Sequence, residues 1–430
     1  MFGPALSSPV ARTTSYKVVI PFYVYAAVSF LVATVLLLTS GGAFTGHYFQ
    51  PHILAITHVM ALGWATMIIL GASHQLLPVL IESDLYSNKL GHLSFGLAAM
   101  GIPLLVYGFY TFNLGVVAQL GGSLVTGAVL AYIANIILSI SQSKRKNVHA
   151  MFVLTASIWL LLTVSLGLSL LFNFTFSVFP ENSLSYLPLH AHLGLVGWFL
   201  LLVLGVGSRL IPMFLISKYS APRLLWAVFA LVNTGLVLYG LLFLFHAAPG
   251  LSFIPAGMVL LALLLFAYYC RQAYTQRIRK KVDDQMKISL LAVALLLLPT
   301  LVLLALIGVL LTYTDTQTNV VLLYGFTIFF GWLTAIILGM TFKTLPFIVW
   351  NKVYRHRASL GKMPSPKELF SEPVYRAMAL AYLLGFILFD CGILFAAPVL
   401  LTIGSVALLA TAVLYNWNVL RLVNHKPFRK

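Results

Sequence analysis

Residues 192–213 read HLGLVGWFLLLVLGVGSRLIPM, and this stretch decides the fold because the chain contains two further copies of it. Residues 58–79 read HVMALGWATMIILGASHQLLPV, and residues 326–347 read FTIFFGWLTAIILGMTFKTLPF. Each copy has a Gly-Trp pair, a second glycine eight residues after the first, and a proline fifteen residues after the first. The first glycines are Gly63, Gly197 and Gly331, so successive copies lie 134 residues apart. An internal repeat of this kind predicts three equivalent structural units.

The composition is typical of a polytopic membrane protein. Of the 430 residues, 61% are hydrophobic and only 8% are charged, and the mean hydropathy is +0.99. Soluble domains carry about 25% charged residues. Apolar runs of about 20 residues, long enough to cross a bilayer as helices, recur along the chain at 17–40, 51–80, 93–113, 115–141, 149–173, 186–216, 222–246, 250–270, 286–312, 318–348, 374–394 and 396–421.

We therefore predict an all-α protein with twelve transmembrane helices. The 134-residue period groups them into three pseudo-threefold units of four helices, with repeats at about 17–141, 149–270 and 286–421. Together they form a single membrane domain over residues 1–430. This organisation differs from the paired halves that are common among transporters.

Basic residues predict the orientation in the membrane. The connections at 41–50, 172–188 and 312–319 contain no Lys or Arg. By the positive-inside rule, both termini are cytoplasmic, in a bacterial-type inner (plasma) membrane. The net charge of +17 then reflects topology and attraction to anionic lipid, and we expect no nucleic-acid partner. The basic residues lie in the alternate connections: Arg12 and Lys17, Lys89, KRK at 144–146, Lys218 and Arg223, RIRKK at 277–281, Lys352 to Arg376, and the terminal KPFRK.

Two basic features near the cytoplasmic ends of helices have simple interpretations. Arg209 and Lys343 occupy equivalent repeat positions, and we expect their side chains to reach the lipid headgroups. The loop at 351–373 is basic and contains prolines, and we expect it to lie on the membrane surface or to dock a partner. We expect membrane lipid, and other respiratory or redox subunits, as partners.

The repeat also separates scaffold residues from candidate site residues. The Gly-Trp pair, second glycine and proline occur in all three units, which indicates close helix packing, an interfacial tryptophan ring and a helix stop. The histidines break the repeat. His58 and His192 occupy the same position, but its third copy is Phe326. A feature that one unit lacks is not required for packing alone.

Six histidines are predicted to lie toward the outer face. Imidazole binds iron, copper and zinc, and two axial imidazoles from facing helices suit a haem. His58 and His192 are symmetry mates and form the predicted axial pair, and Gly63 and Gly197 join them as candidate cofactor-binding residues. The candidate ligands for copper or another metal ion are His52, His190, His47 and His246. Hydrogen bonding, for example between His190 and Tyr186, is the alternative role.

Here the sequence resembles a known group. Twelve helices in three four-helix units, with outer-side histidines on the second and sixth spans, resemble the haem–copper oxidase subunit I superfamily. The pattern HxxxxGW, followed by a glycine and then a proline, is similar to the NnrS-type branch. The resemblance implies a haem, b-type above all, with copper as a second candidate cofactor. It also implies involvement with dioxygen, nitric oxide or respiratory redox stress.

The sequence departs from this superfamily at the reaction centre. The oxidases carry an adjacent histidine pair at the start of the seventh helix and an HxH pattern on the tenth. In this chain the seventh span has only His246, at its far end, and the tenth has Tyr324 and Phe326. We therefore expect a divergent haem-binding relative that handles redox equivalents or gas ligands, and not a standard oxygen or nitric oxide reductase.

Two other functions stay open at this stage. One is a membrane transporter or delivery protein for copper, zinc or haem. A threefold period differs from the common inverted repeats, and Asp390 is the sole carboxylate well inside a predicted helix, which disfavours proton-coupled transport. The other is a non-catalytic structural subunit of a membrane complex, in which the histidines serve only as hydrogen-bonding groups.

Overall fold

A computed structural model describes residues 14–143, 147–278, 280–312, 318–355 and 363–427. Within these ranges the chain is all-helical, apart from one isolated β-bridge between Ser217 and Arg277. Twelve helical spans in the described ranges are long and apolar enough to cross a membrane, which confirms the predicted fold class. The basic residues expected at Arg12, 144–146 and 428–430, and the middle of the 351–373 loop, lie outside the described residues.

Seven spans are single uninterrupted helices, and five consist of consecutive helical segments. The single helices are α1 (Tyr16–Thr39), α4 (Asn88–Tyr110), α5 (Val116–Ser141), α6 (Val148–Phe176), α9 (Pro222–Leu244), α15 (Glu372–Leu394) and α16 (Pro398–Val423). The segmented spans are α2 (Pro51–His58), η2 (Val59–Thr66) and α3 (Met67–Ile81); α7 (Leu187–His192), η3 (Leu193–Leu200) and α8 (Leu201–Leu215); η4 (Pro249–Ser252) and α10 (Phe253–Thr275); α11 (Asp284–Leu295) and α12 (Leu297–Thr312); and α13 (Thr318–Phe326), η5 (Thr327–Leu333) and α14 (Thr334–Tyr354).

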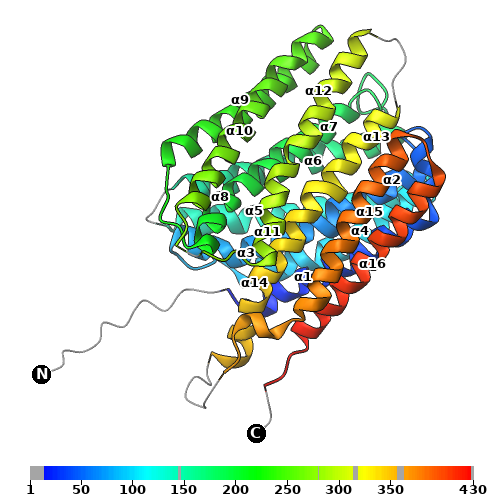
Figure 1. Cartoon of the computed structure of the whole chain (residues 1–430). Helices are drawn as coiled ribbons and strands as arrows, with labels where there is room; N and C mark the ends of the chain where they lie inside the picture. The colour runs from blue at the N-terminus through cyan, green and yellow to red at the C-terminus, as the bar shows by residue number, and fades with distance from the viewer. Residues whose placement is uncertain (1–13, 144–146, 279, 313–317, 356–362, 428–430) are drawn as a thin grey trace, which may run out of the picture.

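The helices form one bundle in which α1 begins and α16 ends at the same end (Figure 1). We call this the terminal end and the opposite one the far end. Polar N-caps start four helices at the terminal end, where a side-chain oxygen accepts a hydrogen bond from a free backbone N–H. These caps are Ser15, Ser87, Asn147 and Asp283. The described connections at the far end carry no Lys or Arg, so the basic residues gather at the terminal end.

Three spans contain a π-helical segment at equivalent positions. The segments η2, η3 and η5 begin at Val59, Leu193 and Thr327, which are 134 residues apart, like the sequence motifs. Each segment contains the Gly-Trp pair and starts one residue after His58, His192 or Phe326. Because a π-helical turn widens the helix and changes the direction of neighbouring side chains, such turns are frequent at functional sites.

The repeated glycines lie at helix contacts. A Cβ atom on Gly63 would lie 2.7 Å from the Ser29 hydroxyl of α1, and one on Gly197 would lie 2.7 Å from Cβ of Trp159 on α6. The second glycine behaves in the same way, since a side chain at Gly205 would overlap Phe152 of α6. Small residues of this kind let transmembrane helices approach closely. Gly63 and Gly197 therefore hold the spans that carry the histidines against their neighbours.

The tryptophans lie in the centre of the bundle, so the expected interfacial ring is wrong. Trp64 and Trp198 are completely buried. The Trp64 indole N–H donates to the Thr334 hydroxyl at 3.2 Å, and that of Trp198 donates to the Thr66 hydroxyl at 3.0 Å. Each bond joins two of the three repeat-bearing spans. These spans pack on one another in the interior, where a tryptophan needs a protein partner for its N–H.

Lys343 does not reach the lipid headgroups, so that expectation is also wrong. Its side chain is buried and donates to the Asp283 carboxylate at 2.5 Å, and Lys367 lies 3.3 Å from the same carboxylate. Burial alone would raise the pKa of Asp283. The Lys343 hydrogen bond and charge, the Met286 N–H and the Lys367 charge outweigh burial, so the pKa lies below its usual range. Asp283 therefore ties the start of α11 to α14.

Candidate functional site

A cavity opens beside His192 in the half of the bundle nearer the far end. Its volume is about 410 Å³, within the usual range of ligand pockets of about 300 to 1,000 Å³. Side chains of α7, η3, α9, α10, α12, α13 and η5 line it, and most are Leu, Val, Ile, Ala or Pro. The polar groups on its wall include His192, Tyr239 and Tyr324. The site therefore combines an apolar chamber with one imidazole and three phenols, those of Tyr48, Tyr239 and Tyr324.

His192 is held in an orientation that suits a ligand. Its Nδ1 lies 2.8 Å from the Pro188 carbonyl oxygen. Because a carbonyl can only accept, Nδ1 carries the hydrogen, and Nε2 of the neutral ring carries the lone pair. Nε2 lies 3.4 Å from the Tyr324 hydroxyl, and the Tyr239 ring centroid lies 4.9 Å from that of His192. A backbone anchor on one ring nitrogen is the usual arrangement for a histidine that binds a metal through the other.

His58 has the same anchor but a different environment. Its Nδ1 lies 2.8 Å from the Leu54 carbonyl oxygen, and its ring packs on Phe109 of α4 at 4.3 Å between centroids. His58 is not among the residues that line the cavity beside His192. The two histidines therefore contact different neighbours, and their pairing on one haem stays a prediction.

The third equivalent position is filled by stacked aromatic rings. Phe326 stacks on Phe389 at 4.4 Å and on Phe330 at 4.7 Å between ring centroids. Phe44 completes the group through an edge contact with Phe389 at 4.9 Å. The repeat position thus has three roles in the three units: His58 packs on Phe109, His192 faces a cavity, and Phe326 fills its space with hydrocarbon.

The other predicted ligands are not among the residues that line this cavity. His52 stacks on Tyr110 at 5.1 Å, and exposed His47 stacks on Tyr48 at 4.2 Å. His246 is exposed and follows the end of α9. The His190 ring bonds through Nδ1 to the Thr163 carbonyl oxygen at 3.1 Å, rather than to the Tyr186 side chain.

No three or more His, Cys, Asp or Glu side chains in the described ranges form a group that could hold a metal ion.

Sequence reasoning did not identify Tyr239 as a site residue. Tyr239 lies outside the repeated sequence motif, but the 134-residue period relates it to a residue of the first unit. Adding 134 to Leu105, which packs in the cluster around Leu54 and Phe109, gives Tyr239. The equivalent position in the unit without histidine holds Phe389, because the third unit carries a longer insertion before α15. The three aligned residues are therefore Leu105, Tyr239 and Phe389.

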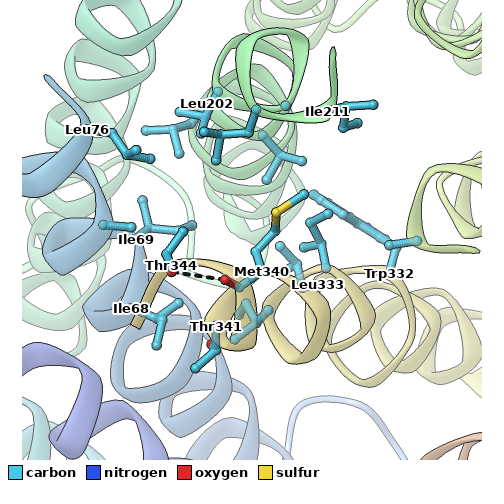
Figure 2. Close-up of a pocket in the computed structure, with 18 of the residues that line it drawn as sticks. Ile68, Ile69, Leu76, Leu202, Ile211, Trp332, Leu333, Met340, Thr341 and Thr344 are labelled. Atoms are coloured by element: carbon cyan, nitrogen blue, oxygen red, sulfur yellow. Dashed lines mark hydrogen bonds between the residues drawn. The ribbon is translucent and has the colours of Figure 1, made fainter. Parts of the chain in front are cut away.

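A second and smaller cavity lies between α3, α8 and α14, the helices that follow the three π-helical segments. Its volume is about 100 Å³, and Figure 2 shows side chains of these helices, among them Ile69, Leu202 and Met340, around a common space. Leu296 and Trp332 line both cavities, so the two adjoin. An apolar cavity of this size suits a small apolar molecule better than water.

Comparison with known proteins supports the fold. A solved structure described as a haem–copper terminal oxidase dimer superposes with a TM-score of 0.60 at 12% sequence identity, over 96% of this chain and 85% of that chain. No protein-family model matches the chain, and no curated protein sequence matches it. The chain is thus a multi-pass membrane protein with the fold of a haem–copper oxidase. At 12% identity the likeness concerns the fold alone.

Proposed function

We propose that the protein binds a haem in the cavity beside His192 and handles redox equivalents or a gas ligand there. The observation that carries this proposal is His192 itself. Its Nδ1 is anchored on Pro188, which directs the ligating Nε2 toward a largely apolar chamber of about 410 Å³. A haem supplies a one-electron redox centre that also binds diatomic gases.

The residues present fit a haem with one protein ligand. The Leu, Val and Ile side chains of the wall suit the macrocycle, and His192 would supply a nitrogen ligand to the iron. On the same wall Tyr324 lies within reach of that nitrogen, and Tyr239 packs on the ring. His192 is the one histidine among the residues that line this cavity, so the haem would depend on His192 for its protein ligand there. Involvement with nitric oxide or dioxygen belongs to this proposal, as does a b-type haem.

The adjoining axial cavity supports a role with small apolar molecules. Dioxygen and nitric oxide are small and weakly polar, so a continuous apolar region past Leu296 and Trp332 would offer them space inside the bundle. The proposal also places the basic terminal end on the cytoplasmic side of a bacterial-type inner membrane, by the positive-inside rule. The His192 cavity would then lie toward the outer side.

The experiment is an optical spectrum of the protein purified in detergent after expression with ample haem. We expect a Soret band and sharp bands on reduction, and loss of these bands in His192→Ala. His246→Ala is the matched control, because this exposed histidine ends α9 at the same end of the bundle, and its spectrum should be unchanged. A colourless wild-type protein of normal stability would refute the haem proposal. It would leave metal delivery or a structural role, with the copper and zinc content deciding between them.

A further inference from the structure

Hydrogen bonds between tryptophan and threonine join the repeat-bearing spans in a regular way. Trp198 of the second unit donates to Thr66 of the first, and Trp64 of the first unit donates to Thr334 of the third. The tryptophans at 64, 198 and 332 are 134 residues apart, and so are positions 66, 200 and 334. In a threefold arrangement the remaining bond would run from Trp332 of the third unit to position 200 of the second.

This third bond is missing. Position 200 holds Leu200, whose side chain has no acceptor for an indole N–H. Within the described part of the chain, Trp64 and Trp198 form their bonds, whereas the Trp332 N–H forms none. Trp332 is only 3% exposed, so bulk solvent does not replace the missing acceptor. Because a buried donor without a partner is unfavourable and rare in folded proteins, the Trp332 N–H requires an explanation.

The Trp332 side chain borders empty space. Trp332 lines both the cavity beside His192 and the smaller cavity between α3, α8 and α14, and Figure 2 shows it on the wall of the smaller one. Leu200, which replaces the expected threonine, lines the cavity beside His192, and Leu296 lines both cavities. The residue without a hydrogen-bond partner therefore lies where the two cavities adjoin.

This junction lies apart from the ligating nitrogen of the proposed haem site. Leu200 follows His192 by eight residues, and Trp332 follows Tyr324 by eight residues. Eight residues are a little over two helical turns, or about 12 Å along each span. The junction is therefore a second position in the same apolar region, and its use does not depend on a haem at His192.

The lining of the junction defines the chemistry of its ligand. None of the described residues that line the two cavities is Lys, Arg, Asp or Glu, so a charged ligand would be costly to bury. An indole N–H can only donate, so the ligand must carry an acceptor. Water is a poor occupant, because it needs at least two polar partners and neither Leu200 nor Leu296 offers one.

We propose that the Trp332 N–H is the polar recognition group of a binding site for a small neutral molecule that carries a hydrogen-bond acceptor, such as a carbonyl oxygen, on an apolar body. The ligand's acceptor takes the place that a threonine hydroxyl has beside Trp64 and Trp198. The apolar body of the ligand lies against Leu200 and Leu296, in the space that the two cavities share.

The test observes the Trp332 indole directly, by NMR of the haem-free protein labelled with ¹⁵N-tryptophan in detergent micelles. Trp332→Phe assigns the signal by its loss. The probes are cyclopentanone, which has a carbonyl acceptor, and cyclopentane, which has the same ring without one. We expect cyclopentanone, and not cyclopentane, to move the Trp332 N–H signal downfield. Followed through the methyl signals of the cavity leucines, cyclopentanone binding should weaken about 5-fold in Trp332→Phe, as expected for one hydrogen bond, while cyclopentane binding should stay within about 2-fold.

Leu200→Thr and Leu200→Val form a matched pair of variants, because threonine and valine have nearly the same shape and differ in the hydroxyl. Leu200→Thr should supply the missing acceptor, so the Trp332 N–H signal should move downfield without any probe. Cyclopentanone should then bind about 5-fold more weakly to Leu200→Thr than to Leu200→Val.

Three results would overturn the proposal: no binding of cyclopentanone, an equal effect of Trp332→Phe on both probes, or equal cyclopentanone binding by the two Leu200 variants. Gel filtration and circular dichroism identify a variant that fails to fold. If Trp332→Phe fails, the Leu200 pair, which keeps the indole, decides the question. Because these measurements use haem-free protein and leave His192 in place, their failure is distinguishable from failure of the haem proposal, which the optical spectrum tests.

Discussion

The ion pair between Lys343 and Asp283 gives the sharpest test of how the bundle is assembled at its terminal end. The two side chains are only 7% and 10% exposed, so replacing Lys343 with methionine leaves a largely buried carboxylate. Breaking a buried pair from one side costs about 3 to 5 kcal/mol. Asp283 keeps Lys367 at 3.3 Å and the Met286 N–H, so we expect the low end, about 3 kcal/mol.

A double-mutant cycle separates pairing from packing. Asp283→Asn removes the charge but can still cap α11, since asparagine is also a good N-cap. We expect Lys343→Met with Asp283→Asn to unfold with a free energy within about 1 kcal/mol of the wild type. The assay is reversible unfolding in mixed micelles, followed by circular dichroism. A single-variant cost within about 0.5 kcal/mol would be typical of a surface position and would refute the buried pair.

The pair also predicts a pH dependence with a definite sign. Because the pKa of Asp283 is lowered in the folded protein, its contribution is complete above the unfolded pKa of about 4 and is lost as the pH falls through the folded value. The difference between the wild type and Lys343→Met should therefore shrink below about pH 4. A difference that stays constant down to pH 3 would contradict the assignment.

Three further predictions concern packing and orientation. Gly205→Ala forces a methyl group against Phe152 and should lower the unfolding free energy by about 1 to 3 kcal/mol. Gly257→Ala is the control, because a Cβ there meets nothing within 4 Å, and it should raise the unfolding free energy by up to about 1 kcal/mol. Equal effects of the two variants would contradict the packing. Trp198→Phe and Thr66→Val each remove the hydrogen bond between these two residues and should each lower the unfolding free energy by about 1 kcal/mol. The double variant should lose no more than the larger single loss plus a few tenths of a kcal/mol. Fully additive losses would argue against the hydrogen bond. In a chain without Cys270 and Cys391, a cysteine at exposed Asn182 should react with an impermeant maleimide in intact cells and one at exposed Ser220 should not; the reverse pattern would invert the proposed orientation.

Sequence patterns predicted the spans well because bilayer-length apolar runs leave few alternatives. The predicted 222–246 corresponds to α9 (Pro222–Leu244), and 396–421 corresponds to α16 (Pro398–Val423). The prediction was shorter than the structure where a helix continues through polar residues. α14 ends at Tyr354 rather than at 348, and α4 begins at Asn88 rather than at 93.

Side-chain partners were harder to predict because they depend on contacts between distant segments. The partner of Lys343 is Asp283, the N-cap of a helix 60 residues earlier in the chain. Similarly, a tryptophan beside lipid and a tryptophan between inner helices have the same local sequence. The repeat aligns His190 with Tyr324, and in the structure the Tyr324 hydroxyl lies 3.4 Å from Nε2 of His192.

The most direct test of the account is a cryo-EM map of the protein loaded with haem. We predict flat density in the cavity bounded by α9, α10 and α12, continuous with Nε2 of His192 and close to Tyr324. Haem density between His58 and His190, or an empty cavity beside His192 in a preparation with stoichiometric haem, would contradict the account.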